Sequence, residues 1–216
     1  GIDENGNYNS ETGTDKLAKY AEMFGLGQKS GVEISESSPQ ISTEDSVRSA
    51  IGQGNSNYTV SQLNRYVTAV ANRGTVYDLT LIDKTTDSNG KLIKDYSAEV
   101  INTMDEVSST TWDLVQGGMQ RMVANSSTFT GSGISMSGKT GTAQQSSLCS
   151  THALFVGYAP SDSPEISIAI RIAYGYTSSY AAEVARDLVR IYFNRDLAGE
   201  LITGTAADLG TAISGD

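Results

Sequence analysis

A string of eight residues combines a cation, hydroxyl groups and bare backbone, which together could bind a carboxylate. It reads Ser137-Gly138-Lys139-Thr140-Gly141-Thr142-Ala143-Gln144. A lysine beside threonine hydroxyls can hold a carboxylate through charge-assisted hydrogen bonds. Gly138 and Gly141 remove side chains where a second backbone would come close, so an extended peptide could pair here as an added strand. A bare Lys-Thr-Gly is a weak signal, because a glycine-rich strand with one solvated lysine has the same composition.

Other reactive side chains are few. The single cysteine, Cys149, cannot form an internal disulfide, and its sequence neighbours offer no activating base. The single histidine, His152, excludes a His-rich metal site, and no Cys or His spacing resembles a zinc motif. We expect His152 to be a packed or hydrogen-bonded structural residue. The sequence therefore predicts neither a metal nor a cofactor.

Length and charge limit the class of protein. A chain of 216 residues fits one domain or the larger share of one. The net charge of −10 argues against nucleic acid as a partner, because phosphate binding relies on clustered Lys and Arg. No stretch approaches the roughly 18 consecutive apolar residues of a membrane helix, and no leader opens the sequence. We therefore expect any signal or anchor to lie outside these residues.

Apolar residues at helical spacing predict the helices that must support this string. They span about residues 14–24, 59–74, 111–124 and 179–193. The second is the best marked, because Thr59 and Gln62 have capping-box spacing and Gly74 ends it. The expected apolar faces are Leu17, Tyr20, Ala21 and Phe24; Leu63, Tyr66, Val67 and Val70; Trp112, Val115, Met119 and Met122; and Ala181, Val184, Ala185, Leu188, Ile191 and Tyr192.

Strands dominate the last third of the chain. They are expected at residues 134–142, 152–159 and 165–174, the last with isoleucine at every second position. Their linkers are too short for helical crossovers, so the three strands should run antiparallel. An earlier hairpin is expected to pair residues 79–84 with 91–96 through an Asn89-Gly90 turn. The predicted fold class is α/β, of the α+β type, with an antiparallel sheet flanked by helices.

The residues around Lys139 make the weak tripeptide specific. Over most of its length the chain resembles the class B penicillin-binding proteins, in which Lys-Thr-Gly accompanies Ser-x-x-Lys and a Ser-Asp-Asn type motif. The order and spacing of the shared phrases match from about Lys16 to Phe193. These phrases are Tyr20–Gly27, Gly31–Ile34 with Glu36, Ala50–Gly54, Thr59–Leu63, Ala71–Gly74 and His152–Pro160. Val60 replaces the family's usual proline and Leu154 a frequent aromatic, and neither change removes a chemical group.

The resemblance implies a β-lactamase/transpeptidase-like fold and a D,D-transpeptidase of peptidoglycan cross-linking. Its ligands would be stem peptides ending in D-Ala-D-Ala and the β-lactams that mimic them. Lys139 would supply positive potential, and Thr140 and Thr142 would offer hydroxyls to the substrate carboxylate. The backbone N–H of Thr142 would be one oxyanion-hole donor. Gly138, Gly141 and Gln144 would shape the edge that receives the substrate.

The family's nucleophile motif is not found in this sequence. The only Ser-x-x-Lys is Ser88-Asn89-Gly90-Lys91, which should cross a hairpin tip, and no Ser-x-Asn occurs. We therefore expect residues 14–194 to be the C-terminal part of a transpeptidase domain, inactive alone, between a flexible segment 1–13 and a tail 195–216. The upstream part of that domain is then an expected partner, with self-association as a further expectation. The resemblance places the protein at the extracytoplasmic face of a bacterial cytoplasmic membrane.

Two other interpretations remain open from sequence. A serine β-lactamase or β-lactam sensor domain uses the same three motifs, although the Ala50–Gly54 and Thr59–Leu63 phrases favour the transpeptidase. A non-catalytic binding or scaffold module could keep the groove without the serine.

Overall fold

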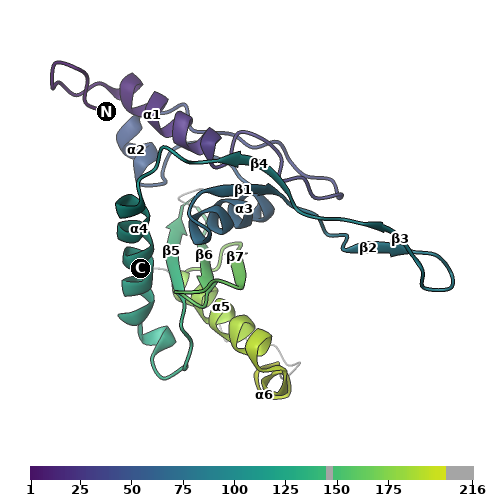
Figure 1. The fold of residues 1–216 in the computed structure, drawn as a ribbon. Helices are drawn as coiled ribbons and strands as arrows, with labels where there is room; N and C mark the ends of the chain where they lie inside the picture. The colour runs from purple at the N-terminus through teal and green to yellow at the C-terminus, as the bar shows by residue number, and fades with distance from the viewer. Residues whose placement is uncertain (145–147, 203–216) are drawn as a thin grey trace. The chain divides into compact units, whose positions relative to one another are not determined.

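The computed structural model describes residues 1–144 and 148–202, and these form two compact units divided between Val115 and Gln116. The first unit contains the helices α1 (Ser10–Met23), α2 (Ser46–Ala50) and α3 (Val60–Ala71) and the strands β1 (Thr75–Asp78), β2 (Lys84–Thr86), β3 (Leu92–Asp95) and β4 (Glu99–Thr103). The second contains a three-stranded sheet and the helix α5 (Ser178–Phe193), as Figure 1 shows. Helix α4 (Ser109–Ala124) crosses the division.

Helix α1 begins earlier than the sequence predicted. Its N-cap is Asn9, whose side chain accepts a hydrogen bond from the Thr12 N–H, so helix forms from Ser10 rather than from about Thr14. The segment expected to be flexible therefore already contains helix. The expected apolar face is only partly buried, because Leu17 and Tyr20 are exposed.

Helix α3 follows its predicted limits closely. Thr59 and Gln62 form the expected capping box, with the Thr59 hydroxyl accepting from the Gln62 N–H and the Gln62 side chain accepting from the Thr59 N–H. At the other end Gly74 has a φ of +112°, and a Cβ there would lie 3.0 Å from Met104 Cβ and 3.1 Å from the Trp112 ring. A side chain at position 74 would thus be both strained and crowded.

Two charged side chains hold the irregular segment 27–45 against this helix. The Arg65 side chain is fully buried, donates to the carbonyl oxygens of Gly25 and Gln28, and lies 3.3 Å from the Asp78 carboxylate. The Glu36 carboxylate accepts hydrogen bonds from Ser30, Thr59 and Ser61. Burial raises the pKa of Glu36, but these hydrogen bonds outweigh it and the net shift is downward. The segment is therefore ordered without forming regular structure.

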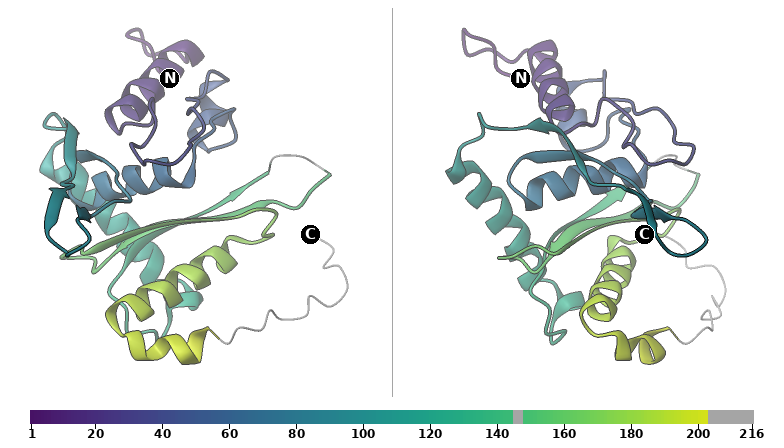
Figure 2. Two further views of the ribbon diagram at one scale, coloured as in Figure 1. Left: turned by 90° about the vertical axis from the view of Figure 1, so that its right-hand side faces the viewer. Right: turned by 45° about the vertical axis from the view of Figure 1, so that its right-hand side comes forward.

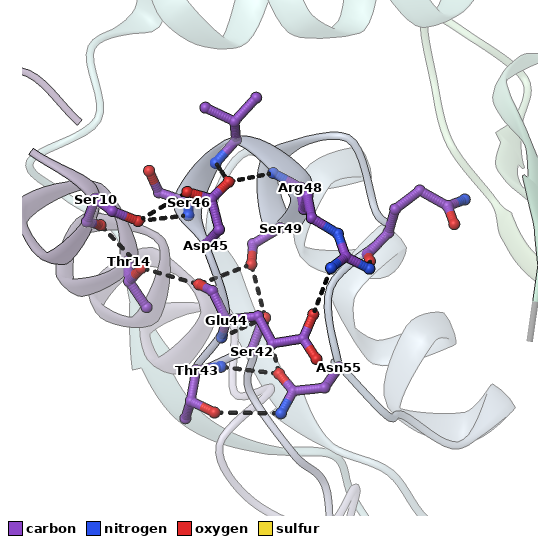
Figure 3. Close-up of polar contacts among 12 residues, drawn as sticks. Ser10, Thr14, Ser42, Thr43, Glu44, Asp45, Ser46, Arg48, Ser49 and Asn55 are labelled. Carbon is purple, nitrogen blue, oxygen red and sulfur yellow. Dashed lines mark hydrogen bonds and ion pairs between the residues drawn. The ribbon is translucent and has the colours of Figure 1, made fainter. Parts of the chain in front are cut away.

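A polar network joins α1 to α2 and the Ala50–Gly54 phrase (Figure 3). Asp45 accepts hydrogen bonds from the backbone N–H groups of Val47 and Arg48, which caps α2, and from the hydroxyl of Ser10. The Asn55 side chain accepts from Ser42 Oγ at 3.0 Å. A Cβ at Gly54 would collide with the hydroxyls of Ser42 and Ser49. Gly54 is thus needed for packing.

The strands of the first unit form two antiparallel pairs. Strand β1 (Thr75–Asp78) pairs with β4 (Glu99–Thr103), which the sequence did not predict. Strand β2 (Lys84–Thr86) pairs with β3 (Leu92–Asp95), and this hairpin extends beyond the β1–β4 pair (Figure 1). The expected strand 79–84 is wrong, because the Thr80 hydroxyl and the Leu81 N–H instead donate to the Glu33 carboxylate. The Asn89-Gly90 turn is confirmed, with Gly90 at a φ of +83°.

The second unit is an antiparallel sheet with α5 (Ser178–Phe193) along one face (Figure 2). Strands β5 (Ser137–Ala143), β6 (His152–Ala159) and β7 (Ile166–Ile172) lie in that order in the sheet, and they run antiparallel, as predicted. The first strand begins at Ser137, so residues 134–136 precede it. The core combines Phe155, Ala153 and Ala159 of the sheet with Ala181, Ala182, Ala185 and Val189 of α5, and with Val123, Phe129 and Met136.

The predicted apolar faces of α4 and α5 are wrong in part. Helix α4 buries Trp112 as expected. The buried side of this helix runs from Trp112 to Val123, three turns later, and Val115 lies off it and is 43% exposed. Helix α5 turns its alanines and Val189 to the sheet, so Val184, Leu188 and Tyr192 are exposed. Small residues let the helix approach the isoleucine-rich sheet closely.

The chain continues after α5 with short helical turns. These are η2 (Arg195–Leu197) and α6 (Ala198–Leu201), which lie within the expected tail. The rest of that tail, residues 203–216, lies outside the described residues. No helix in the described part of the chain has both the length and the apolar character needed to cross a membrane.

The capping box at α3 provides a direct test of this fold. We expect Thr59→Ala to lower the free energy of unfolding by about 1–2 kcal/mol, because one helix N–H and the Glu36 carboxylate each lose a hydrogen bond. Thr59→Ser keeps the hydroxyl and should stay within about 0.5 kcal/mol of the parent. Urea unfolding followed by circular dichroism measures both, and equal stability of the two variants would contradict the role assigned to Thr59.

Candidate functional site

Strand β5 carries the Lys-Thr-Gly string at an edge of the sheet. Its inner edge pairs with β6 throughout, from Ser137 opposite Tyr158 to Ala143 opposite His152. Among the described residues no strand pairs with its outer edge. An open edge presents a row of backbone donors and acceptors. An extended peptide can pair with this row and so add one strand to the sheet.

The side chains of β5 alternate between the two faces of the sheet. Thr140 and Thr142 stand opposite Phe155 and Ala153, whose side chains belong to the core under α5. Lys139 therefore projects from the other face. It is exposed, and its ammonium donates to the carbonyl oxygen of Thr140 at 2.6 Å. Lysine and threonine side chains can thus meet a common ligand only at the open edge of the strand.

Exposure along the strand differs between the predicted site residues. Thr142 is exposed, and Thr140 and Gly141 are half-buried. Gln144 is exposed directly after the strand ends, and residues 145–147 that follow it lie outside the described part. The structure thus brings Lys139, Thr140, Gly141, Thr142 and Gln144 together along one short stretch of edge.

Gly138 has a packing function that the sequence interpretation did not anticipate. It stands opposite Gly157, and the Phe155 ring fills the space that the two glycines leave. A Cβ at position 138 would lie 2.9 Å from Phe155 Cε2 and closer still to Cζ. At Gly141 a Cβ would meet Leu154 Cβ at 3.4 Å, an ordinary contact. Only Gly138 is therefore required by the core, and the expected role of Gly141 at the substrate edge remains a prediction.

A cluster around His152, the residue paired with Ala143 at the end of β5, lies beside the site strand. This side chain is 6% exposed, and its Nδ1 accepts a hydrogen bond from the Tyr174 N–H at 3.1 Å. Arg171 Nη2 lies 3.2 Å from Nε2, and the Tyr174 ring lies 4.9 Å from the imidazole. Burial lowers the pKa of His152, and the charge of Arg171 lowers it further. The structural role predicted for His152 is confirmed.

The loop that supplies Tyr174 has an unusual backbone. Tyr174 and Tyr176 have φ values of +55° and +71°, in a region that residues other than glycine seldom adopt. Thr151 holds the loop, since its carbonyl accepts from the Tyr176 N–H at 3.0 Å and its hydroxyl donates to the Tyr176 carbonyl at 2.6 Å. No local sequence pattern indicated these contacts, because Thr151 and Tyr176 lie 25 residues apart in the sequence.

The one Ser-x-x-Lys of the sequence does not lie in a helix. Ser88 and Lys91 are exposed at the tip of the β2–β3 hairpin, where Asp87 caps the turn by accepting from the N–H groups of Asn89 and Lys91. A helix would place the amine beside the hydroxyl, whereas this turn leaves both in water. The expectation of a hairpin tip is confirmed.

Comparison with known proteins agrees with this geometry. The penicillin binding protein transpeptidase domain family matches residues 7–190. The chain belongs to this family. Penicillin-binding protein 2B of Streptococcus pneumoniae serotype 2 is 27% identical over 209 residues, which cover 87% of this chain and 30% of that protein. Penicillin-binding protein 2A of Bacillus subtilis is 30% identical over 207 residues, covering 83% and 28%. The resemblance to class B penicillin-binding proteins is confirmed.

Solved structures show the same fold. The crystal structure of the D,D-transpeptidase domain of a peptidoglycan glycosyltransferase from Eggerthella lenta superposes with a TM-score of 0.69 at 25% identity. It matches 86% of this chain and 49% of the solved chain. The predicted α/β fold, with its antiparallel sheet flanked by helices, is therefore that of the penicillin-binding transpeptidases. The chain spans about half of that solved chain and less than a third of the two relatives.

The two glycines of the site strand provide a matched pair of variants. We expect Gly138→Ala to lower the free energy of unfolding by about 1–3 kcal/mol, because the new methyl group must displace the Phe155 ring. Gly141→Ala adds the same methyl group where there is room, and should change stability by less than about 1 kcal/mol. Urea unfolding of both variants checks the difference. If Gly138→Ala were as stable as Gly141→Ala, the packing role of Gly138 would be excluded.

Proposed function

We propose that this chain carries the substrate-binding strand of a peptidoglycan D,D-transpeptidase whose nucleophile lies on another part of the same domain. The observation that carries the proposal is the Lys139–Thr142 string on the open edge of β5, in a chain of the penicillin-binding transpeptidase family. The proposal extends to the whole protein's activity, of which this chain spans a part.

In the proposed reaction, a serine hydroxyl loses its proton to a neighbouring base and attacks the carbonyl carbon of the penultimate D-alanine. The peptide bond to the terminal D-alanine breaks, and that residue leaves with a proton on its nitrogen. An amine from a neighbouring stem peptide then attacks the acyl-enzyme, which forms the cross-link and releases the serine. A β-lactam acylates the same serine when its ring amide opens.

The residues of β5 bind and orient the substrate in this scheme. The stem peptide pairs with the outer edge of the strand, with Gly141 allowing close approach and Gln144 flanking it. Lys139 supplies positive potential, and the hydroxyls of Thr140 and Thr142 donate to the terminal carboxylate. The Thr142 N–H donates to the developing oxyanion beside the N–H of the serine. Loss of one such donor costs about 10²–10³ in rate, so a chain with half of the hole and no nucleophile should be inactive alone.

The same proposal identifies the partners and the location. The upstream part of the transpeptidase domain would complete the site, and stem peptides and β-lactams would be its ligands. Peptidoglycan lies outside the cytoplasmic membrane, so the site would face that side. The exposed position of Ser88 and Lys91 supports a nucleophile elsewhere.

The test uses a longer form of the protein that extends upstream to a helical Ser-x-x-Lys. We expect Lys139→Ala in that form to lower the second-order rate constant of acylation by a fluorescent penicillin about 10- to 100-fold, because a charged hydrogen bond to the carboxylate is lost. Lys91→Ala, at the hairpin tip, is the matched control and should leave the rate unchanged. An unchanged rate in the Lys139 variant, or an equal loss in both, would overturn the assignment of β5 as the substrate strand.

A further inference from the structure

A second cation lies on the same face of the sheet as Lys139. Leu154 of β6 stands opposite both Gly141 of β5 and Arg171 of β7, so these three residues share one face. Lys139 shares it too, because alternate residues of a strand point the same way. This face is opposite to α5, and we call it the site face. Apart from His152, Lys139 and Arg171 are the only ionisable side chains of the three strands.

The Arg171 guanidinium is held in place by His152. Its Nη2 lies 3.2 Å from Nε2 and 3.4 Å from Nδ1 of the imidazole. His152 is itself fixed, because it is almost fully buried and its Nδ1 accepts a hydrogen bond from the Tyr174 N–H. Burial and the charge of Arg171 lower the pKa of His152, so the imidazole is neutral at neutral pH and Arg171 carries the charge of the pair. No Asp or Glu in the described part of the chain forms an ion pair with Arg171.

The roles proposed for β5 determine the direction in which a bound stem peptide runs. In that complex the terminal carboxylate lies at the hydroxyls of Thr140 and Thr142, and the carbonyl of the penultimate D-alanine lies at the Thr142 N–H. The stem residue before the two D-alanines, here called the preceding residue, then lies one position further along, beside Ala143. Because Ala143 pairs with His152, the preceding residue lies at the end of β5 where His152 holds Arg171.

A side chain of the preceding residue can cross β5 on the site face. Gly141 has no side chain and Ala143 has only a methyl group, so little stands between the outer edge of β5 and the guanidinium. The stem backbone and β6 would be two strand spacings apart, about 10 Å. A side chain of about five bonds reaches about 6 Å, and a charged hydrogen bond covers about 3 Å more. An acidic group at the end of such a side chain can therefore meet Arg171.

We propose that Arg171 is a specificity-determining residue that binds a carboxylate at the end of the preceding residue's side chain. This inference rests on the proposed function of β5. A diamino dicarboxylic acid carries such a carboxylate, whereas lysine, of similar length, ends in an ammonium group that Arg171 repels. Only Nη2 contacts His152, so the planar guanidinium has donors left for a carboxylate. The substrate class is a stem peptide with a diamino dicarboxylic acid before the two D-alanines.

Lys139 and Arg171 bind different groups of one stem in this scheme. Residues 139 and 143 are about 13 Å apart along a strand, so the two cations lie near opposite ends of the site string. Lys139 acts on the terminal carboxylate, which every stem peptide and every penicillin carries. Arg171 acts on a side chain that differs between substrates. Loss of Arg171 should therefore change the choice between substrates and leave acylation itself intact.

The test uses the longer form of the protein that extends upstream to a helical Ser-x-x-Lys. Two penicillins share one acyl side chain of about five bonds, which ends in a carboxylate in one compound and in a primary carboxamide in the other. We expect the carboxylate compound to acylate the parent with a second-order rate constant about 10-fold higher. Arg171→Gln should bring the two rate constants within about 2-fold, whereas Arg171→Lys should keep part of the difference. High salt should also reduce the difference.

Arg195→Gln is the matched control. Arg195 is exposed beyond the far end of α5, a helix of 16 residues and so about 24 Å long, and its loss should leave both rate constants unchanged. An unchanged rate with the carboxamide compound verifies that the Arg171→Gln site is intact.

Three results would overturn the assignment of Arg171. They are equal rates of the two penicillins on the parent, a difference that survives Arg171→Gln, and an equal loss of both rates in Arg171→Gln, which would mark a structural role. If neither compound acylated the parent, the proposed function itself would fail, and this inference with it.

Discussion

The Phe155 ring, set against the opposed glycines Gly138 and Gly157, is the contact on which the candidate site depends. The ring occupies the space that a side chain at position 138 would need on the α5 face of the sheet. It thereby packs the start of β5 against the core under α5. The next residue, Lys139, must then project from the opposite face. The position of the cation thus follows from a packing requirement one residue earlier.

Most of the family phrases in the first unit position backbone and carry no reactive group. Arg65 binds the carbonyls that follow α1, Glu36 binds the hydroxyls at the start of α3, and Gly74 passes close to Trp112. Each feature is a buried polar or crowded position with few alternatives. Their order along the chain is therefore a strong indicator of fold, and only an indirect one of chemistry.

Sequence reasoning succeeded where the determinants are local. The capping box of α3 and the limits of β6 follow from neighbouring residues, and the site string lies on the strand that was expected. It failed where distant partners decide. The β1–β4 pair and the contacts of His152 join segments far apart in sequence, and the sheet decides which flank of α5 is buried. The sequence predicts that Lys139 and the threonines lie on opposite faces of the strand. Which of the two faces packs against α5 depends on the core residues of β6.

The central claim is that this chain holds the substrate strand without the nucleophile. Incubating the 216-residue chain with a fluorescent penicillin, followed by a denaturing gel and intact mass, tests it most directly, with a full-length penicillin-binding protein as positive control. The account predicts a stable adduct on the control and none on this chain. A stoichiometric adduct on a serine of this chain would contradict it, and mapping that serine would identify a different active site.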